Sequence, residues 1–166
     1  MLAPPVVLFL AQTGASAWPR FELANGSIAA FPGKPSLNTA EGAGYQAYDY
    51  SYSGKNEAAS LILYVYADGN AKRLANWKEP QKQEFLAAIV RLTAEQKGAK
   101  ISTTNFTKQG NNPILDAQLS GMGGSKITTF CRAIPTKQGV ALFLYSHSDA
   151  ERAAMGIRQF LSGTKL

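Results

Sequence analysis

Cys131 and His147 are the only cysteine and the only histidine of the 166-residue chain, and together they form its one possible nucleophile–base pair. Such a pair needs a thiolate activated by an imidazole within hydrogen-bonding reach, with a third group to orient the base. Cys131 lies in an apolar segment that predicts a strand, where a lone cysteine is usually a small buried side chain. His147 lies just before a predicted helix, where the ring is usually solvated. We therefore predict no catalytic residue and no enzymatic activity.

The sequence contains no metal-binding pattern. A single histidine gives no two-histidine arrangement, one cysteine cannot build a thiolate-rich zinc site, and the carboxylates do not cluster. Residues 121–126, Gly-Met-Gly-Gly-Ser-Lys, share the glycine content of a phosphate-binding loop. The Walker pattern, however, places lysine before serine or threonine and opens a helix, whereas here lysine follows serine and a strand is expected next. We expect a connecting loop and no cofactor.

A row of three tyrosines is the first candidate binding surface. The sequence alternates over residues 45–52, which places Tyr48, Tyr50 and Tyr52 on one face of a predicted strand. Phenol rings offer flat area with a polar tip, so the row suits a ligand or a peptide. The alternative is core packing beneath a helix. Arg73 and Trp77, in the segment after the next strand, complete the set of five candidate binding residues.

Two apolar segments, 61–66 and 140–145, predict strands that are buried on both faces. We expect them to be neighbours at the centre of a sheet, and a strand covered on both faces needs a layer above and a layer below. Residues 80–97 and 149–162 supply two helices for these layers, because their apolar side chains recur at spacings of three and four. The sequence Ser148-Asp149-Ala150-Glu151 predicts a capping box with Ser148 at the start of the second helix.

The remaining segments predict the connections and the other strands. Asn25-Gly26 suits a type I′ turn between two short strands. Residues 36–44 are expected to be a polar loop, and 71–77 at most one helical turn. Further strands are expected at 101–107, 114–120 and 127–134. The predicted fold class is therefore α+β, an antiparallel β-sheet sandwiched by helices in the order ββ–ββ–α–ββββ–α.

Residues 1–17 predict an export signal. Residues 6–11 are apolar but too few to span a bilayer, and Ala15-Ser16-Ala17 matches a small-x-small cleavage site. No lysine or arginine precedes the apolar stretch, and the alternative is a tail or an extra strand. We expect one α+β domain over residues 18–166, periplasmic or secreted, with no transmembrane segment in the mature chain. A single cysteine allows no internal disulfide, which fits a bacterial envelope better than a eukaryotic extracellular space.

The chain is basic, with a formal net charge of +6 and a pI of about 9.5. This balance is typical of a soluble domain with a moderately basic surface. The alternatives are an acidic partner, an anionic membrane surface or nucleic acid. The lysines and arginines are scattered, and the longest run is Lys72-Arg73. Without an arginine-rich arm or an RNA-binding signature, nucleic acid is not an expected partner.

Two short motifs at the ends of the predicted domain suggest a family. Residues 27–35 run from a strand into a Phe-Pro-Gly-x-Pro turn, and 140–161 run from a strand into a helix that carries Phe160 and Leu161. In these motifs the chain resembles uncharacterised bacterial exported domains of the PsbP/DcrB-like group, although Ser36-Leu37 stand where many members have tyrosine or tryptophan. The resemblance implies a sheet between helices and a binding or accessory role, and it carries over no catalytic residue.

The predicted function is therefore non-catalytic binding in the bacterial envelope, with an envelope protein as the partner. The alternative is a small-ligand or lipid carrier, with an apolar pocket between a helix and the sheet lined by rings such as Tyr48, Tyr50, Trp77 and Phe85. A third interpretation is an enzyme of unrecognised type, which a pocket with two facing titratable groups would favour.

Overall fold

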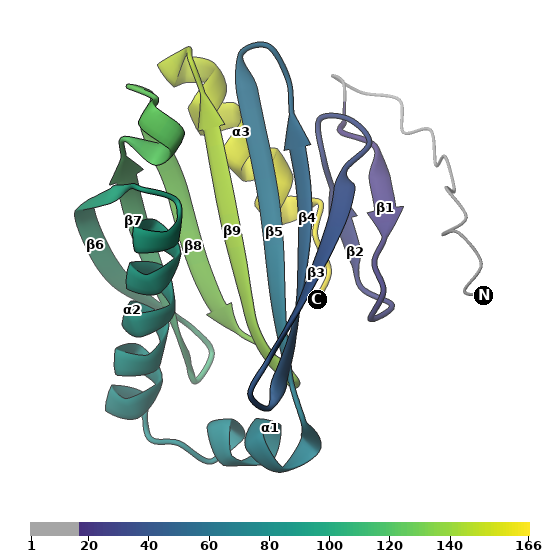
Figure 1. Cartoon of the computed structure of the whole chain (residues 1–166), viewed down its shortest axis with the longest axis vertical. Helices are drawn as coiled ribbons and strands as arrows, with labels where there is room; N and C mark the ends of the chain where they lie inside the picture. The colour runs from purple at the N-terminus through teal and green to yellow at the C-terminus, as the bar shows by residue number, and fades with distance from the viewer. Residues whose placement is uncertain (1–16) are drawn as a thin grey trace.

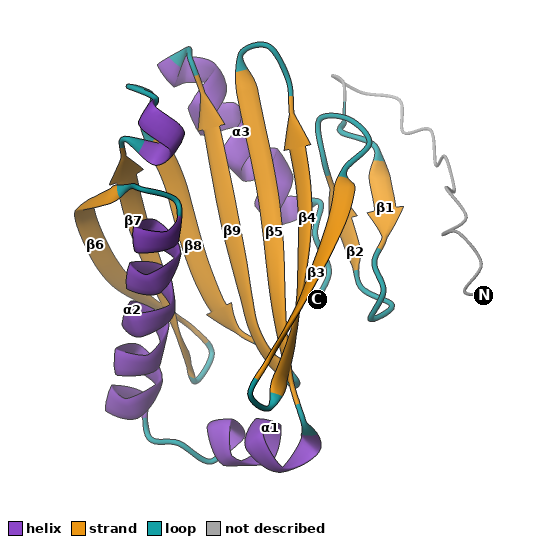
Figure 2. Cartoon of the chain, in the orientation of Figure 1, coloured by secondary structure: helices purple, strands orange, loops and turns teal. Residues whose placement is uncertain are grey.

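The computed structural model describes residues 17–166, so the predicted export signal lies outside the described residues except for Ala17. A seven-stranded antiparallel sheet in the order β3-β4-β5-β9-β8-β7-β6 forms the centre of the fold (Figures 1 and 2). Its strands are β3 (Ser36–Gly42), β4 (Tyr45–Ser53), β5 (Glu57–Tyr66), β6 (Lys100–Gln109), β7 (Asn112–Ser120), β8 (Thr129–Pro135) and β9 (Gly139–His147). The class α+β is confirmed.

Three α-helices, a 3₁₀ turn and a separate hairpin accompany the sheet. The helices are α1 (Asp68–Ala75), α2 (Glu79–Gln96) and α3 (Ala150–Ser162), the 3₁₀ turn is η1 (Met122–Gly124), and the hairpin pairs β1 (Arg20–Glu22) with β2 (Ile28–Ala30). Among residues 17–166, none of these helices combines the length and the hydropathy that crossing a bilayer requires.

The two predicted central strands are neighbours, as expected. β5 pairs antiparallel with β9, with Leu61 opposite Phe143 and Ile62 opposite Leu142. Leu61, Ile62 and Leu63 are all buried, because alternate side chains of this strand enter the cores on the two faces of the sheet. The pair β5–β9 therefore joins both cores.

Helix α2 covers one face of the sheet, which we call the α2 face. It begins with Pro80 in its first turn, where the missing amide donor costs nothing, and ends before Gly98, whose φ of 65° suits a glycine. Leu86, Ile89 and Val90 pack on β7 and β8, next to Leu142 from the centre of the sheet. This helix matches the predicted segment 80–97.

Helix α3 and the β1–β2 hairpin cover the opposite face, which we call the α3 face (Figure 1). Phe160 of α3 is 1 % exposed and lies between Phe31 of the hairpin and Phe143 of β9, with ring centroids 5.2 Å from each. The N-cap of the helix is Asp149, whose Oδ1 accepts a hydrogen bond from the amide of Arg152 at 2.9 Å. The prediction of Ser148 as the cap was therefore wrong by one residue.

The covering layers are displaced from each other across the sheet. On the α2 face, α2 packs on β6, β7 and β8, whereas on the α3 face the core lies over β4, β5 and β9. This displacement leaves half of each face of the sheet without a covering helix. On the α2 face the uncovered half carries small polar residues such as Asp49, Ser51 and Ser60, and on the α3 face it carries Asp116 and Arg132.

Two elements differ from the predicted order. Residues Ser36–Gly42 form the edge strand β3 and not a loop, because they pair with β4 along their whole length. All seven are exposed, so no alternation of buried and polar residues marks them in the sequence. The expected single turn at 71–77 is instead the eight-residue helix α1, which has Asp68 in its first turn and buries only Leu74.

Candidate functional site

The outer edge of β6 is one of the two exposed edges of the sheet, and it carries two exposed apolar side chains. Among the described residues no strand pairs with this side of β6, and all ten of its residues are exposed. Phe106 pairs with Leu115 and Ile101 with Leu119, and both leucines belong to the core under α2, so Phe106 and Ile101 lie on the α2 face. They are 39 % and 38 % exposed. We call this surface the β6 edge surface.

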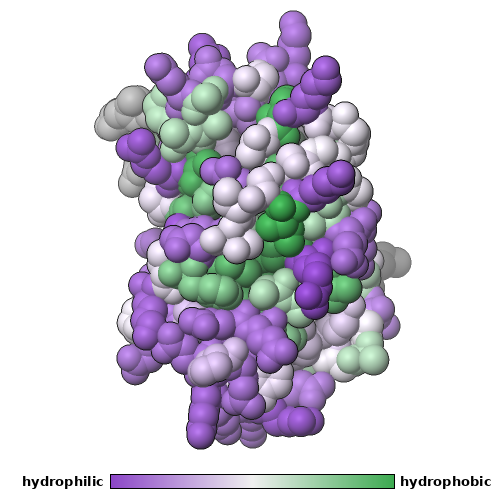
Figure 3. All heavy atoms as spheres, turned by 90° about the vertical axis from the view of Figure 1, so that its left-hand side faces the viewer, coloured by the Kyte–Doolittle hydropathy of each residue, from purple (hydrophilic) through white to green (hydrophobic). Residues whose placement is uncertain are grey.

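Figure 3 views the molecule from this side and shows hydrophobic atoms gathered across its middle, with hydrophilic residues above and below. An exposed strand edge offers unpaired amide and carbonyl groups to another extended chain. The two apolar side chains of β6 add a second kind of contact, because they would stand beside the side chains of an added strand. The β6 edge surface can therefore bind an extended peptide segment.

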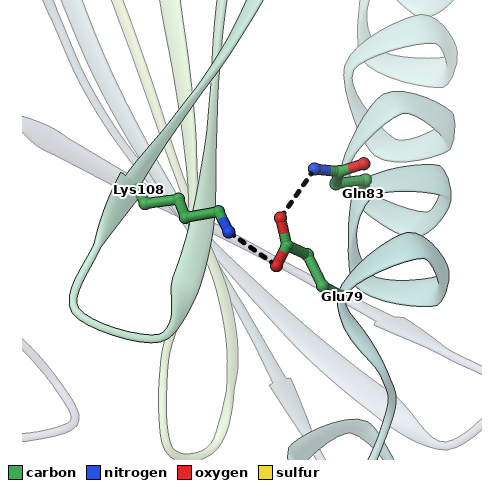
Figure 4. Close-up of polar contacts among 3 residues, drawn as sticks. All are labelled: Glu79, Gln83 and Lys108. Atoms are coloured by element: carbon green, nitrogen blue, oxygen red, sulfur yellow. Dashed lines mark hydrogen bonds and ion pairs between the residues drawn. The ribbon is translucent and has the colours of Figure 1, made fainter.

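The electrostatics of this edge are basic. From Lys97 to Leu115 the chain contains three lysines and no carboxylate. One of the three, Lys108, is drawn back over the α2 face, where its Nζ lies 2.8 Å from Oε2 of Glu79 (Figure 4). Gln83 donates to the other oxygen of Glu79 at 3.3 Å, so this carboxylate is held at the start of α2. Lys108 is therefore tied to the helix.

A groove of about 790 Å³ surrounds the β8–β9 turn at the end of the sheet next to α1. On the α2 face it is lined by Tyr64, Leu74, Lys82 and Val140, and on the α3 face by Arg132, Ile134, Phe143, Leu161 and Leu166. The turn itself contributes Lys137. The groove combines apolar walls with cationic side chains, and no side-chain carboxylate lines it. Its volume lies in the range that holds small ligands, about 300–1,000 Å³.

A smaller cavity of about 270 Å³ lies over the uncovered half of the α2 face. Its walls include Asp49, Ser51, Ser60 and Lys97. The hydroxyl of Ser60 donates to Oδ1 of Asp49 at 2.7 Å. Tyr52, Met122 and Leu144 also line this cavity, so it combines apolar side chains with a carboxylate that is already bonded to a hydroxyl of the neighbouring strand.

The predicted tyrosine row does lie on one face, and it packs under the β1–β2 hairpin on the α3 face. Tyr50 is 6 % exposed, and its hydroxyl accepts a hydrogen bond from the amide of Ala24 at 2.7 Å. The hydroxyl of Tyr48 donates to Gln46 at 2.7 Å, and Tyr52 is half-buried. Tyr50 therefore links the hairpin to the sheet, and the row does not line either cavity, except for Tyr52, which borders the smaller one.

Arg73 and Trp77 lie apart from the tyrosine row. Arg73 is exposed on α1, and the ring of Trp77 stacks edge-on against Phe85 of α2 with centroids 5.3 Å apart. Phe85 in turn contacts Tyr66, which lies on the α2 face. The five predicted binding residues are therefore divided between two surfaces.

Burial, with a smaller contribution from the neighbouring Tyr45 and Tyr64, raises the pKa of Tyr66 to about 12. Between pH 10 and 12 the unfolded chain releases this proton while the folded chain retains it, so the free energy of unfolding falls as pH rises. We expect Tyr66→Phe to lose less stability than the unsubstituted protein across this interval. Chemical denaturation at each pH measures the difference, and parallel stability curves would contradict the assignment.

Cys131 and His147 do not form a pair. Cys131 is fully buried in the core of the α2 face. His147 lies at the end of β9, opposite Glu57 in the strand register, so its side chain is on the α3 face. Burial raises the pKa of the Cys131 thiol to about 12, so the thiol is protonated at neutral pH. Within residues 17–166, no three histidine, cysteine, aspartate or glutamate residues come together as a metal site would require.

The groove and the β6 edge surface were not among the predicted sites. Lys82, Lys137 and Phe106 belong to three parts of the chain that are separate in the sequence. The order of the strands in the sheet determines where each of them lies on the surface. The sequence contained only weak signals of these two sites. One was the alternating segment at β6, and the other was a lysine in the turn between β8 and β9. Comparisons of the chain with protein-family models, with curated proteins and with solved structures gave no match.

Proposed function

We propose that this is a non-catalytic binding protein of the bacterial envelope, periplasmic or secreted, whose partner is another envelope protein. The observation that supports this proposal is the β6 edge surface. It offers a ten-residue strand edge with Phe106 and Ile101 exposed beside it. Pairing with an exposed edge gives affinity through main-chain hydrogen bonds, and alternate side chains give specificity.

The charge of the edge indicates what the partner segment contains. The stretch from Lys97 to Leu115 contains no carboxylate. Lys100, at the first position of β6, forms no salt bridge among the described residues. Two copies of this edge would bring like charges together, which disfavours self-pairing. We therefore expect an extended segment with β-branched or aromatic residues and an acidic end.

The edge also has features that limit indiscriminate pairing. A register shift between Ile101 and Thr103 interrupts the ladder with β7, and such bulges and edge lysines are devices that protect strand edges. The regular part of the edge therefore starts after this shift, and Phe106 lies within it.

Affinity capture from envelope extract tests this proposal. We expect Phe106→Asp to lower recovery of the partner about ten-fold or more, because it places a charge at an apolar contact. Leu37→Asp is the matched control, since Leu37 is also exposed but lies on β3, at the opposite edge of the sheet. Equal losses with both variants, or no partner recovered with the unsubstituted protein, would contradict the proposal.

A second candidate function, a small-ligand or lipid carrier, is favoured by the groove around the β8–β9 turn. The groove is lined by partly exposed apolar residues such as Ile134 and Leu161 and by the cationic Lys82, so an apolar ligand would find both a wall and a polar contact. Native mass spectrometry of protein purified from the envelope tests this function. A small molecule bound in stoichiometric amount supports a carrier, and a ligand-free spectrum argues against it.

A further inference from the structure

We propose that the groove around the β8–β9 turn binds an anionic amphiphile, a single alkyl chain with a carboxylate or phosphate head, and that Lys82 and Lys137 hold the head. This inference rests on the second candidate function, the carrier, and names its ligand class. It does not depend on binding of a protein at the β6 edge surface.

The charge distribution of the groove is the first observation. Lys82, Lys137 and Arg132 line it, and none of its lining side chains is a carboxylate. Arg132 is already engaged, because its Nε and Nη2 donate to the two oxygens of Asp116 at 2.6 and 2.8 Å. A fork-shaped contact of this kind satisfies the guanidinium. The two lysines are therefore the cations available to a ligand.

The local contacts of the two lysines leave most of their donors free. Nζ of Lys82 makes one long hydrogen bond, 3.4 Å to the side-chain oxygen of Asn112, and Lys137 forms no ion pair among residues 17–166. Glu79, the carboxylate one turn before Lys82, is bound by Lys108 and Gln83 (Figure 4). Because an ammonium group has three donors, each lysine retains the capacity to bind a carboxylate or phosphate oxygen.

The walls of the groove supply the apolar part of the site. Leu74 and Val140 on the α2 face and Phe143 on the α3 face form the buried floor of the groove, and Ile134 and Leu161 are partly exposed apolar residues of its lining. A groove that passes around a turn accommodates a flexible chain better than a rigid ring. Burial of the alkyl chain would provide much of the affinity, and the two lysines would provide the preference for an anion.

Calorimetric titration with ten-carbon amphiphiles below their micellar concentrations tests this inference. The probes are decanoate and decyl phosphate as anions, decyl glucoside as a neutral ligand and decyltrimethylammonium as a cation. We expect the anions to bind at least ten-fold more tightly than decyl glucoside and the cation most weakly, with the preference falling as salt is added. Comparison of decanoate with decyl phosphate distinguishes the two head groups.

The double variant Lys82→Gln, Lys137→Gln should lose the preference for the anions and retain the affinity for decyl glucoside. The matched control is Lys55→Gln, Lys126→Gln, which removes the same charge from exposed positions outside the groove. Equal affinity for anionic and neutral probes, or an equal loss in the control, would overturn the anion assignment and leave the carrier function standing. Absence of binding by every probe would overturn both.

Discussion

Phe160→Ala is expected to lower the free energy of unfolding by about 3–5 kcal/mol, the cost typical of removing a fully buried aromatic ring. Phe160 is 1 % exposed, and its ring packs both on Phe143 of the sheet and on Phe31, which follows β2 of the hairpin. The centroid of its ring also lies 6.2 Å from the ring centroid of Trp18 and 6.5 Å from that of Tyr145. The substitution leaves a cavity among four rings that cannot all close around it.

Urea denaturation measures this loss, and Met155→Ala is its control on the same helix. Met155 is 58 % exposed, so its truncation should change stability by no more than about 0.5 kcal/mol. A loss below about 1 kcal/mol for Phe160→Ala would show that α3 does not pack on the sheet as described.

Gly156→Ala is expected to destabilise the protein by about 2 kcal/mol, although alanine favours helices more than glycine does. A Cβ atom at this position of α3 would overlap the hydroxyl and ring of Tyr145. Tyr145 is 2 % exposed, and its hydroxyl donates to Oε2 of Glu57 at 2.9 Å, so the ring cannot move without breaking this bond. The free-energy cost of overpacking and of disturbing the Tyr145–Glu57 hydrogen bond together exceeds the free energy gained from the higher helix propensity of alanine.

The matched control for Gly156 is Gly69→Ala in α1. A Cβ atom at Gly69 meets no atom within 4 Å, so here only helix propensity changes and the protein should gain about 0.5–1 kcal/mol. The two glycine-to-alanine substitutions should thus have opposite signs in thermal or urea denaturation. A stabilising effect of Gly156→Ala would contradict the packing of α3 against β9.

Local sequence patterns were sufficient for the centre of the fold. The apolar segments at 61–66 and 140–145 form adjacent strands, and the predicted helices at 80–97 and 149–162 match α2 and α3 closely. In the helices the buried side chains recur at spacings of three and four, and in the two strands an unbroken apolar run reflects burial on both faces, so each pattern reports the structure directly. Asn25-Gly26 correctly marks the turn of the hairpin, where Gly26 has a φ of 78°, but the predicted type I′ geometry was wrong, because Asn25 does not have the positive φ that this turn requires.

Edges and surfaces were harder to predict for a physical reason. β3 is a strand only because β4 pairs with it, and a fully exposed segment has no periodic burial to record in its sequence. Alternation placed Tyr48, Tyr50 and Tyr52 on one face, but it does not tell which layer covers that face. The hairpin covers it, whereas Trp77 packs beside α2, so the predicted binding residues do not form one site.

The candidate sites depend on this same tertiary information. The groove forms because the β8–β9 turn lies near α1 and the start of α2, and the β6 edge surface forms because β6 is the last strand in the sheet order. Neither follows from a motif. The predicted resemblance to the PsbP/DcrB-like group, the envelope location and the protein partner remain proposals that the experiments above address.

Site-specific photo-crosslinking tests the central proposal, binding of a protein partner at the β6 edge surface, most directly. A photoreactive phenylalanine analogue replaces Phe106 in one variant and Leu37 in the other, so that each exposed edge of the sheet carries one probe. In envelope extract, we predict one discrete crosslinked product from position 106, mapping to an extended segment with an acidic end, and none from position 37. A product from position 37 alone, or no product from either position, would contradict the proposal.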